Sequence, residues 1–245
     1  MTKPTCDVWW AEPAQAHPGL LDLLDEEERA RHARFRLAAD RDRYAVAHAL
    51  ARLVCARRAG CAPQEVRFTL HCRNCESRRE PRTEPHGKPR PAGPALGLEI
   101  SISHSGDRVA LAVSDGVEVG VDVEAVAPDR DIDRLASYTL TEKELAAWHA
   151  LPGAERTAGF FRYWARKEAL LKATGDGLSA GLGSVGVTGP GDPAGLVAWS
   201  APKAPADVWL TDLDAGADYR AALAVLAPGP VALAMHRAAP LLAAG

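Results

Sequence analysis

Residues 117–124 of the chain, Val-Glu-Val-Gly-Val-Asp-Val-Glu, place a valine at every odd position and a charged residue or glycine at every even one. A repeat of two residues is the period of a β-strand with one buried and one polar face. The sequence therefore predicts a half-buried strand, with Asp122 and Glu124 projecting from the same face. Two carboxylates at this spacing repel each other unless a cation or an unusual protonation state intervenes. Magnesium is the natural partner, because it takes oxygen ligands and is usually held by one or two carboxylates. A solvated strand face is the alternative explanation of the pair.

A second informative segment, residues 160–174, is rich in alanine, leucine, arginine, lysine and glutamate. This content favours a helix, which Gly175 and Gly177 would end. At helical spacing Glu168 and Lys172 share one face, where the alternative is an ordinary surface ion pair. Aromatic residues would bury the other side of the helix and orient its polar side toward the rest of the protein. These residues are Phe160, Phe161, Tyr163 and Trp164.

Together these segments resemble the signature of the 4'-phosphopantetheinyl transferases, in their longer, monomeric surfactin-synthetase-activating branch. The matching sequences are Gly-Val-Asp-Val-Glu at 120–124, Trp-x-x-Lys-Glu-Ala-x-x-Lys at 164–172, and the Gly-x-Gly-Leu that follows. Ser103-His104-Ser105 is similar to the family's Ser-His-Ser segment, and Gly87-Lys88-Pro89 to its Gly-Lys-Pro. Residues 31–52 resemble its basic first helix, so the resemblance extends over residues 25–187.

The resemblance implies an enzyme that transfers the 4'-phosphopantetheine arm of coenzyme A to a serine of an apo acyl or peptidyl carrier protein, releasing 3',5'-ADP. It implies that Asp122, Glu124 and Glu168 hold Mg²⁺ against the coenzyme A pyrophosphate. Glu168 would also be the general base for the carrier serine, directly or through water. Such a base typically contributes a factor of about 10² to 10⁴. Lys172 and Lys167 would neutralise charge on the pyrophosphate and the leaving group.

By the same resemblance, five further side chains contact coenzyme A: Arg31, Arg52, Lys88, Ser103 and His104. Ser103 and His104 would contact its phosphates, and the three cations would fix its 3'-phosphate or adenine end. A 3'-phosphate is dianionic near neutrality, so several fixed cations are expected. The chain departs from the family pattern at Glu28, where relatives often place a lysine. That phosphate contact is then missing or is made by Arg29 or Arg31.

Plain structural explanations stay open for several of these residues. Ser103-His104-Ser105 is also compatible with a polar turn that contains a structural histidine, and no hydrolase triad accompanies it. A group of arginines near the first helix is typical of a solvated helix face, and we expect one or two of them to bind the nucleotide. They are Arg29, Arg31, Arg34, Arg36, Arg41 and Arg43.

The order of the predicted elements indicates an α+β fold. Helices are expected near 20–34, 40–58, from Thr141 with a capping box, and over 160–174; strands are expected near 66–70, 98–103, 110–114, 117–124, 184–188, 197–200, 208–213 and 221–226. The resemblance implies two similar subdomains related by a pseudo-twofold axis, each a small, mostly antiparallel sheet packed with helices. The active site would lie in the cleft between them.

We therefore expect three parts along the chain. Residues 1–116 would form an N-terminal subdomain that contacts the nucleotide end of coenzyme A. Residues 117–237 would form a C-terminal subdomain with the magnesium ligands and the catalytic helix. The Ala-rich tail, residues 238–245, is expected to be disordered.

Composition is consistent with a cytoplasmic enzyme, and the resemblance implies a monomer. The 245 residues, 47% of them hydrophobic, suffice for one sizeable core or two small ones. No run of eighteen apolar residues occurs and the first ten residues lack the apolar core of a signal peptide, so neither a membrane span nor secretion is expected. A net charge of -3 argues against general nucleic-acid binding. Five cysteines without a secretory signal predict free thiols.

One short pattern, Cys72-x-x-Cys75 with His71 and His86 nearby, resembles half of a zinc site. A single Cys-x-x-Cys knuckle is a weak signal, and the charged, proline-rich surroundings also fit a plain long loop.

Two other functions share part of these features. A magnesium-dependent enzyme acting on another nucleotide pyrophosphate would use the same acids and lysines. A noncatalytic module that binds carrier proteins would share the surface, although the complete carboxylate set argues against it. The sequence does not name the carrier; its high alanine, glycine, proline and arginine content favours a GC-rich bacterium and thus polyketide or nonribosomal peptide biosynthesis.

Overall fold

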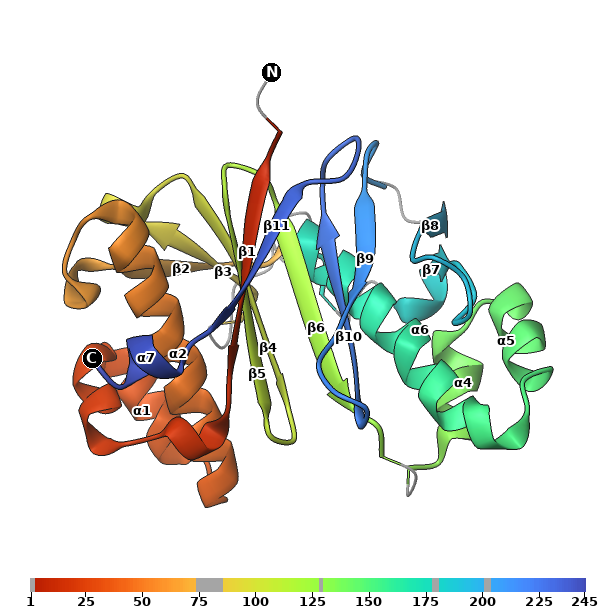
Figure 1. Ribbon diagram of the computed structural model, residues 1–245, viewed down its shortest axis with the longest axis horizontal. Coiled ribbons are helices and arrows are strands. Elements are labelled where there is room, and N and C mark those ends of the chain that lie inside the picture. The colour runs from red at the N-terminus through yellow and green to blue at the C-terminus, as the bar shows by residue number, and fades with distance from the viewer. Residues whose placement is uncertain (1–2, 74–85, 128–129, 178–180, 201–203) are drawn as a thin grey trace.

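The computed structural model describes residues 3–73, 86–127, 130–177, 181–200 and 204–245, and it confirms the predicted α+β class (Figure 1). Its helices are α1 (Glu26–Arg34), α2 (Ala38–Ala59), α4 (Ile132–Thr139), α5 (Glu142–His149), α6 (Gly153–Thr174) and α7 (Ala239–Leu242). Its strands are β1 (Thr5–Ala11), β2 (Arg67–His71), β3 (Lys88–Ala92), β4 (Leu98–Ser105), β5 (Arg108–Asp115), β6 (Val119–Ala125), β7 (Val185–Val187), β8 (Leu196–Trp199), β9 (Trp209–Leu213), β10 (Tyr219–Val225) and β11 (Ala232–Arg237).

The strands form small sheets in the centre of the molecule, with helices on either side (Figure 1). One sheet has the order β11-β1-β5-β4 and another the order β6-β10-β9, while β2 pairs with β3 and β7 with β8. All of these pairs are antiparallel except β1 with β11. Helices α1, α2 and α7 lie on one side of the central strands, and α4, α5 and α6 lie on the other.

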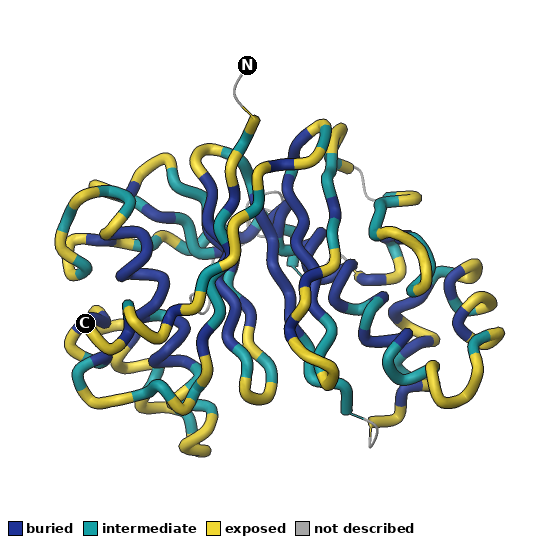
Figure 2. Tube along the Cα trace, viewed as in Figure 1, coloured by how far each residue is buried: buried dark blue, intermediate teal, exposed yellow. Residues whose placement is uncertain are grey.

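Each side has its own apolar core, and Figure 2 shows the buried residues concentrated along α2, the central strands and α6. On the first side, Val46, Leu50 and Val54 of α2 pack against Ile100 and Leu111 of the sheet. These α2 positions follow the predicted helical spacing, and α2 ends at Gly60 in the left-handed conformation, as expected for a glycine cap.

Two helix starts show how local sequence sets the boundaries. The Thr141 hydroxyl accepts from the Glu144 N–H at 3.3 Å and the Glu144 carboxylate accepts from the Thr141 N–H at 2.7 Å, which confirms the predicted capping box. Asp25 and Glu28 make a second such box, so the helix predicted from residue 20 begins at Glu26 and follows a 3-10 helix, Pro18–Leu23.

The first and last strands differ from the sequence predictions. β1 and β11 were not predicted, and their parallel pairing brings the end of the chain back to the first half. β11 lacks the alternation of apolar and polar residues that marks a strand, and four of its six residues are exposed. Its sequence therefore gives little indication of a strand. β3 was also missed, because its sequence Lys-Pro-Arg-Pro-Ala contains two prolines; it is tolerated in a sheet of only two strands.

The tail from residue 238, predicted to be disordered, instead packs against the first core. Ala238 and Leu242 are buried in that core, and residues 239–242 form α7. The imidazole Nε2 of His17 lies 3.1 Å from the carbonyl oxygen of Leu242 and fixes the end of the chain. The prediction considered the Ala-rich composition and overlooked the apolar anchor that the leucine supplies.

Side chains join the two larger sheets where β4 and β6 lie next to each other. The hydroxyls of Ser101, Ser103 and Ser105, all on β4, accept hydrogen bonds from backbone N–H groups of β6. The donors are Val121, Val123 and Ala125, at 3.0, 3.2 and 3.1 Å respectively. Buried N–H groups at a strand edge need such partners, so the serines take the place of a neighbouring strand. We call this contact the serine seam.

Within the described ranges, no helix combines the length and the apolar character needed to cross a bilayer.

Candidate active site

The predicted magnesium ligands of the first segment lie on β6, at the serine seam. Val119, Val121 and Val123 are fully buried, as their alternation predicts. Asp122 is also buried, with 2% of its surface exposed, so the strand is covered on both faces and the prediction of a half-buried strand is wrong in that respect. The reason is α6, which packs against this strand.

Gly120 explains how α6 comes so close to β6. A Cβ atom at this position would collide with the backbone of Ala169 and Ala173. The absence of a side chain therefore lets the helix backbone rest directly on the strand. The glycine of Gly-Val-Asp-Val-Glu thereby brings the helix residues Glu168 and Lys172 beside Asp122.

Lys172, Asp122 and Ser103 form a hydrogen-bonded cluster. The Lys172 ammonium donates to Oδ1 of Asp122 at 2.6 Å and to Oγ of Ser103 at 2.9 Å. The Ser103 hydroxyl donates to the same Asp122 oxygen at 2.9 Å. The structure thus brings together three residues that come from β4, β6 and α6.

Glu168 and Glu124 complete the acidic part of the site. Burial, followed by the nearby Asp122 carboxylate, raises the pKa of Glu168 to about 7, although Lys172 opposes the shift. The same two causes, in the same order, raise the pKa of Glu124. Proximity of like charges therefore makes full ionisation costly, which a bound cation would relieve.

The donor set fits Mg²⁺ in its chemistry. Oδ2 of Asp122 and Oε1 of Glu168 are buried and have no hydrogen-bond partner, which is costly unless a ligand satisfies them. Carboxylate oxygens are also the protein ligands that Mg²⁺ prefers. Within the described ranges, however, no three acidic, histidine or cysteine side chains converge closely enough to hold a metal, so the three carboxylates are neighbours and not a gathered ligand set.

His104 follows Ser103 and lies near several cations. Loss of surrounding water lowers the pKa of the imidazole, and the charges of Lys172 and Arg43 lower it further. Arg43 belongs to the predicted arginine group, and the sequence did not distinguish it from the other arginines. In the structure it is distinguished by its charge, which lowers the pKa of His104.

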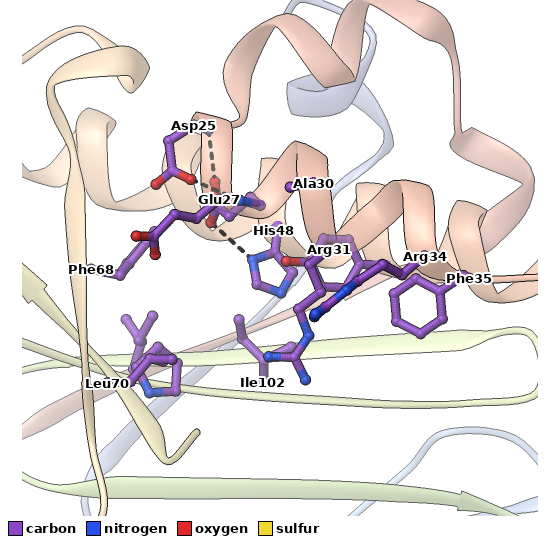
Figure 3. A pocket seen from close by; sticks show the side chains of 14 residues that line it. Asp25, Glu27, Ala30, Arg31, Arg34, Phe35, His48, Phe68, Leu70 and Ile102 are labelled. Atoms are coloured by element: carbon purple, nitrogen blue, oxygen red, sulfur yellow. Dashed lines mark hydrogen bonds and ion pairs between the residues drawn. The ribbon is translucent and has the colours of Figure 1, made fainter. Parts of the chain in front are cut away.

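Next to the serine seam, a cavity of about 640 Å³ opens between α1, α2, β2 and β4 (Figure 3). Phe68, Leu70 and Ile102 are among its apolar lining residues. Arg31 and Arg34 line it as well, and in Figure 3 the Arg31 side chain extends toward Ile102. Asp25, Glu27 and Glu28 line the cavity too, so an anionic substituent on a flat apolar group would match this lining only beside Arg31 and Arg34.

Arg52, predicted to contact the nucleotide, does not line this cavity; it is buried and bonds two residues that do. Its guanidinium donates to Glu28 at 2.7 Å, to Asp25 at 2.5 Å and to the Val66 carbonyl at 2.7 Å. Glu28, the departure from the family pattern, also bonds His48 at 2.9 Å. Burial alone would raise the pKa of Glu28, but these partners hold it below its ordinary value.

Two predicted lysines also point away from the acidic cluster. The Lys88 ammonium donates to the carbonyls of Val119 and Ala173, both at 3.0 Å, and so ties β3 to β6 and α6. The Lys167 ammonium is fully buried and lies 2.6 Å from Glu144 and 2.7 Å from the Thr139 carbonyl.

The zinc alternative involves Cys72, Cys75, His71 and His86. Cys75 lies outside the described residues, so the zinc prediction stays untested. Cys6, Cys55 and Cys61 are free thiols, as predicted.

Comparison with known proteins identifies the family. Residues 118–224, which contain β6 and α6, match the model of the 4'-phosphopantetheinyl transferase superfamily. The 4'-phosphopantetheinyl transferase HetI of Nostoc sp. is 31% identical over 177 residues, covering 70% of this chain and 69% of HetI. The chain belongs to the 4'-phosphopantetheinyl transferase superfamily.

Other members of this superfamily show how far the similarity extends. The slr0495 protein of Synechocystis sp. is 32% identical over 169 residues, which is 69% of this chain but 63% of that protein, just under two thirds of its length. The 4'-phosphopantetheinyl transferase AcpT of Salmonella typhimurium is 40% identical over 78 residues, 32% of this chain and 41% of AcpT. The predicted family is therefore confirmed.

Proposed function

We propose that this protein transfers the 4'-phosphopantetheine arm of coenzyme A to a serine of an apo acyl or peptidyl carrier protein, giving the holo-carrier and 3',5'-ADP. The observation that carries the proposal is the meeting of Asp122, Glu168 and Lys172 at the serine seam, on the two segments typical of the superfamily. Relatives named as 4'-phosphopantetheinyl transferases support it.

In this reaction the carrier serine oxygen bonds to the phosphorus that bears the pantetheine arm. The bond from that phosphorus to the bridging oxygen breaks, and 3',5'-ADP leaves with the electron pair. Glu168 accepts the serine proton, directly or through water. Lys172, whose ammonium lies at the centre of the cluster, balances the charge that develops on the pyrophosphate and the leaving group.

Asp122, Glu124 and Glu168 would hold Mg²⁺, which when bound neutralises the pyrophosphate and polarises its phosphoryl oxygens. The unpartnered oxygens of Asp122 and Glu168 support this assignment. Closing the ligand set requires these side chains to draw together, and it requires Lys172 to share Asp122 with the metal.

The cavity beside the seam is our candidate for the nucleotide end of coenzyme A. Arg31 on its wall, Ser103 at the seam, and His104 on the opposite face of β4 from Ser103 would contact the phosphates. Three further residues predicted to touch the substrate are engaged elsewhere in the structure, so their contacts stay predictions: Arg52, Lys88 and Lys167.

We further propose the longer surfactin-synthetase-activating branch, two subdomains related by a pseudo-twofold axis, a monomeric state and a cytoplasmic location. The resemblance over residues 25–187 supports the branch. An acyl or peptidyl carrier of polyketide or nonribosomal peptide biosynthesis is the partner that this branch suggests.

The test is transfer to a purified apo carrier domain, measured by intact-mass spectrometry with coenzyme A and Mg²⁺. The proposal predicts a mass gain of one phosphopantetheine arm, lost with EDTA and lost when the carrier serine is replaced by alanine. Binding of coenzyme A without any gain on several carrier types would favour a noncatalytic carrier-binding module. Equal calorimetric affinity for coenzyme A and 3'-dephospho-coenzyme A would favour an enzyme of another nucleotide pyrophosphate.

A further inference from the structure

Three serines of the seam alternate along β4, and they differ in what their hydroxyl protons can reach. Ser101 accepts from the Val121 N–H and has no carboxylate partner among the described residues. Ser103 also contacts Asp122 and Lys172. Ser105 accepts from the Ala125 N–H at 3.1 Å, and its Oγ lies 3.0 Å from Oε2 of Glu124.

Hydroxyl chemistry fixes the direction of the Ser105 bonds. A hydroxyl has one proton to donate and two lone pairs that accept. Since the backbone N–H of Ala125 is the donor in one bond, the Ser105 proton goes to the Glu124 carboxylate in the other. Glu124 is thereby held through one oxygen, and its second oxygen is not used by this bond.

The turn after Ser105 is held in place by the opposite sheet. Gly106 adopts the left-handed conformation, with φ at 53°, and begins the tight turn from β4 to β5. The hydroxyl of Tyr219, on β10, accepts from the Asp107 N–H at 2.9 Å. Tyr219 pairs with Ala125 across β10 and β6, so the turn and the end of β6 have a fixed relative position. Ser105 therefore meets Glu124 from a rigid support.

We infer that Ser105 is a positioning residue for the transfer reaction: its hydroxyl sets the orientation of the Glu124 carboxylate and so presents one oxygen to the divalent cation. The inference rests on the proposed function, because it takes Glu124 as a metal ligand. Partners that orient a ligand in this way typically contribute about 10–100-fold to metal affinity or activity.

The experiment compares Ser105→Ala with Ser101→Ala in the full chain. Both substitutions remove a hydroxyl that accepts from β6, but only the first removes a donor to a carboxylate. The readouts are Mn²⁺ binding in the presence of coenzyme A, by electron paramagnetic resonance, and the thermal unfolding midpoint. We expect Ser105→Ala to weaken Mn²⁺ binding about 10-fold or more, and Ser101→Ala to leave it unchanged although it lowers the midpoint.

Equal Mn²⁺ affinity in the two alanine variants would overturn the inference. Should Ser105→Ala fail to fold, the pair Ser105→Thr and Ser105→Val gives the same comparison, because both side chains are β-branched and only threonine carries a hydroxyl. Equal Mn²⁺ affinity in that pair would likewise overturn it. Failure of the proposed function is distinguishable, because wild-type protein would then bind no Mn²⁺ or transfer nothing to a carrier.

Discussion

The ammonium of Lys172 lies 2.6 Å from Oδ1 of Asp122, so the last turn of α6 is tied to the middle of β6. The same oxygen accepts from Ser103, and Oδ2 of Asp122 is buried without a partner. A cation that binds the free oxygen would weaken the attraction between Asp122 and Lys172. If Asp122 binds the metal as proposed, metal binding and the position of the lysine would be coupled, and the lysine would become more available to the substrate when the metal is present.

Stability of the metal-free protein should fall as the pH rises from about 4.5 to about 7. The pKa of Glu168 is raised to about 7 from a value of 4.5 when the group is fully solvated. The folded state then binds more protons than the unfolded state between these two values, and such a group destabilises the fold as it ionises. Urea unfolding in EDTA at pH 5 and pH 8 measures the loss, which for Glu168 is about 2–3 kcal/mol. In Glu168→Gln this contribution should vanish; a pH dependence unchanged from wild type would contradict the assignment.

Gly120→Ala should destabilise the protein and impair the site. The new methyl group would meet the backbone of Ala169 and Ala173, which cannot rotate away, so α6 must shift from β6. Such overpacking typically costs about 1–3 kcal/mol. Thermal unfolding and coenzyme A binding measure the two effects. Gly229→Ala is the control, because no atom lies within 4 Å of the added group there; equal behaviour of the two variants would refute the close approach.

Lys88→Met should lower stability more than it lowers coenzyme A affinity, because it leaves the carbonyls of Val119 and Ala173 unpaired. Each unsatisfied buried group typically costs about 1–3 kcal/mol. Arg31→Ala, on the exposed wall of the cavity, should do the opposite and weaken coenzyme A binding without changing the unfolding midpoint. Calorimetry measures the coenzyme A affinity of each variant, and chemical denaturation measures its stability. Weak binding by a Lys88→Met protein of unchanged stability would favour the sequence-based prediction of a nucleotide contact.

Leu242→Ala should destabilise the first core although the residue is the fourth from the end of the chain. Its side chain is 1% exposed and lies in the core that contains α2. Truncating a buried leucine typically costs about 2–5 kcal/mol. Leu96→Ala, at a side chain that is 79% exposed, provides the comparison. If urea unfolding shows the same small change for both, the tail does not anchor the fold.

Sequence reasoning predicted the elements whose residues carry a local signal. The alternation of residues 117–124, the capping box at Thr141 and the glycine after α6 are all present in the structure. The pairing of β1 with β11 was missed because contact between distant segments leaves no local pattern. Local reasoning therefore predicts single elements better than it predicts the pairing of the first and last strands.

Lys167 and Lys172 of α6 show a similar limit within the site, because both were predicted to act there but only Lys172 bonds Asp122. Lys167 stands next to Glu168 in sequence, but adjacent helical residues point in different directions. Apolar residues flank Lys167 at helical spacing, namely Tyr163, Leu170 and Leu171, and this pattern indicates the buried face on which it lies. No local pattern predicts the bidentate ion pair of Arg166 with Asp212, at 2.7 and 2.8 Å, because the two residues are 46 positions apart in the sequence.

The rate of carrier modification by the Glu168→Gln variant tests whether the Glu168 carboxylate acts as base and metal ligand. Glutamine keeps the shape of the side chain but cannot accept the serine proton or bind Mg²⁺ as a carboxylate does. At saturating coenzyme A and Mg²⁺, we predict transfer at least about 10²-fold slower than wild type. Circular dichroism and thermal unfolding should show an intact fold in the same protein. Transfer at the wild-type rate by a correctly folded Glu168→Gln variant would show that the Glu168 carboxylate has neither role.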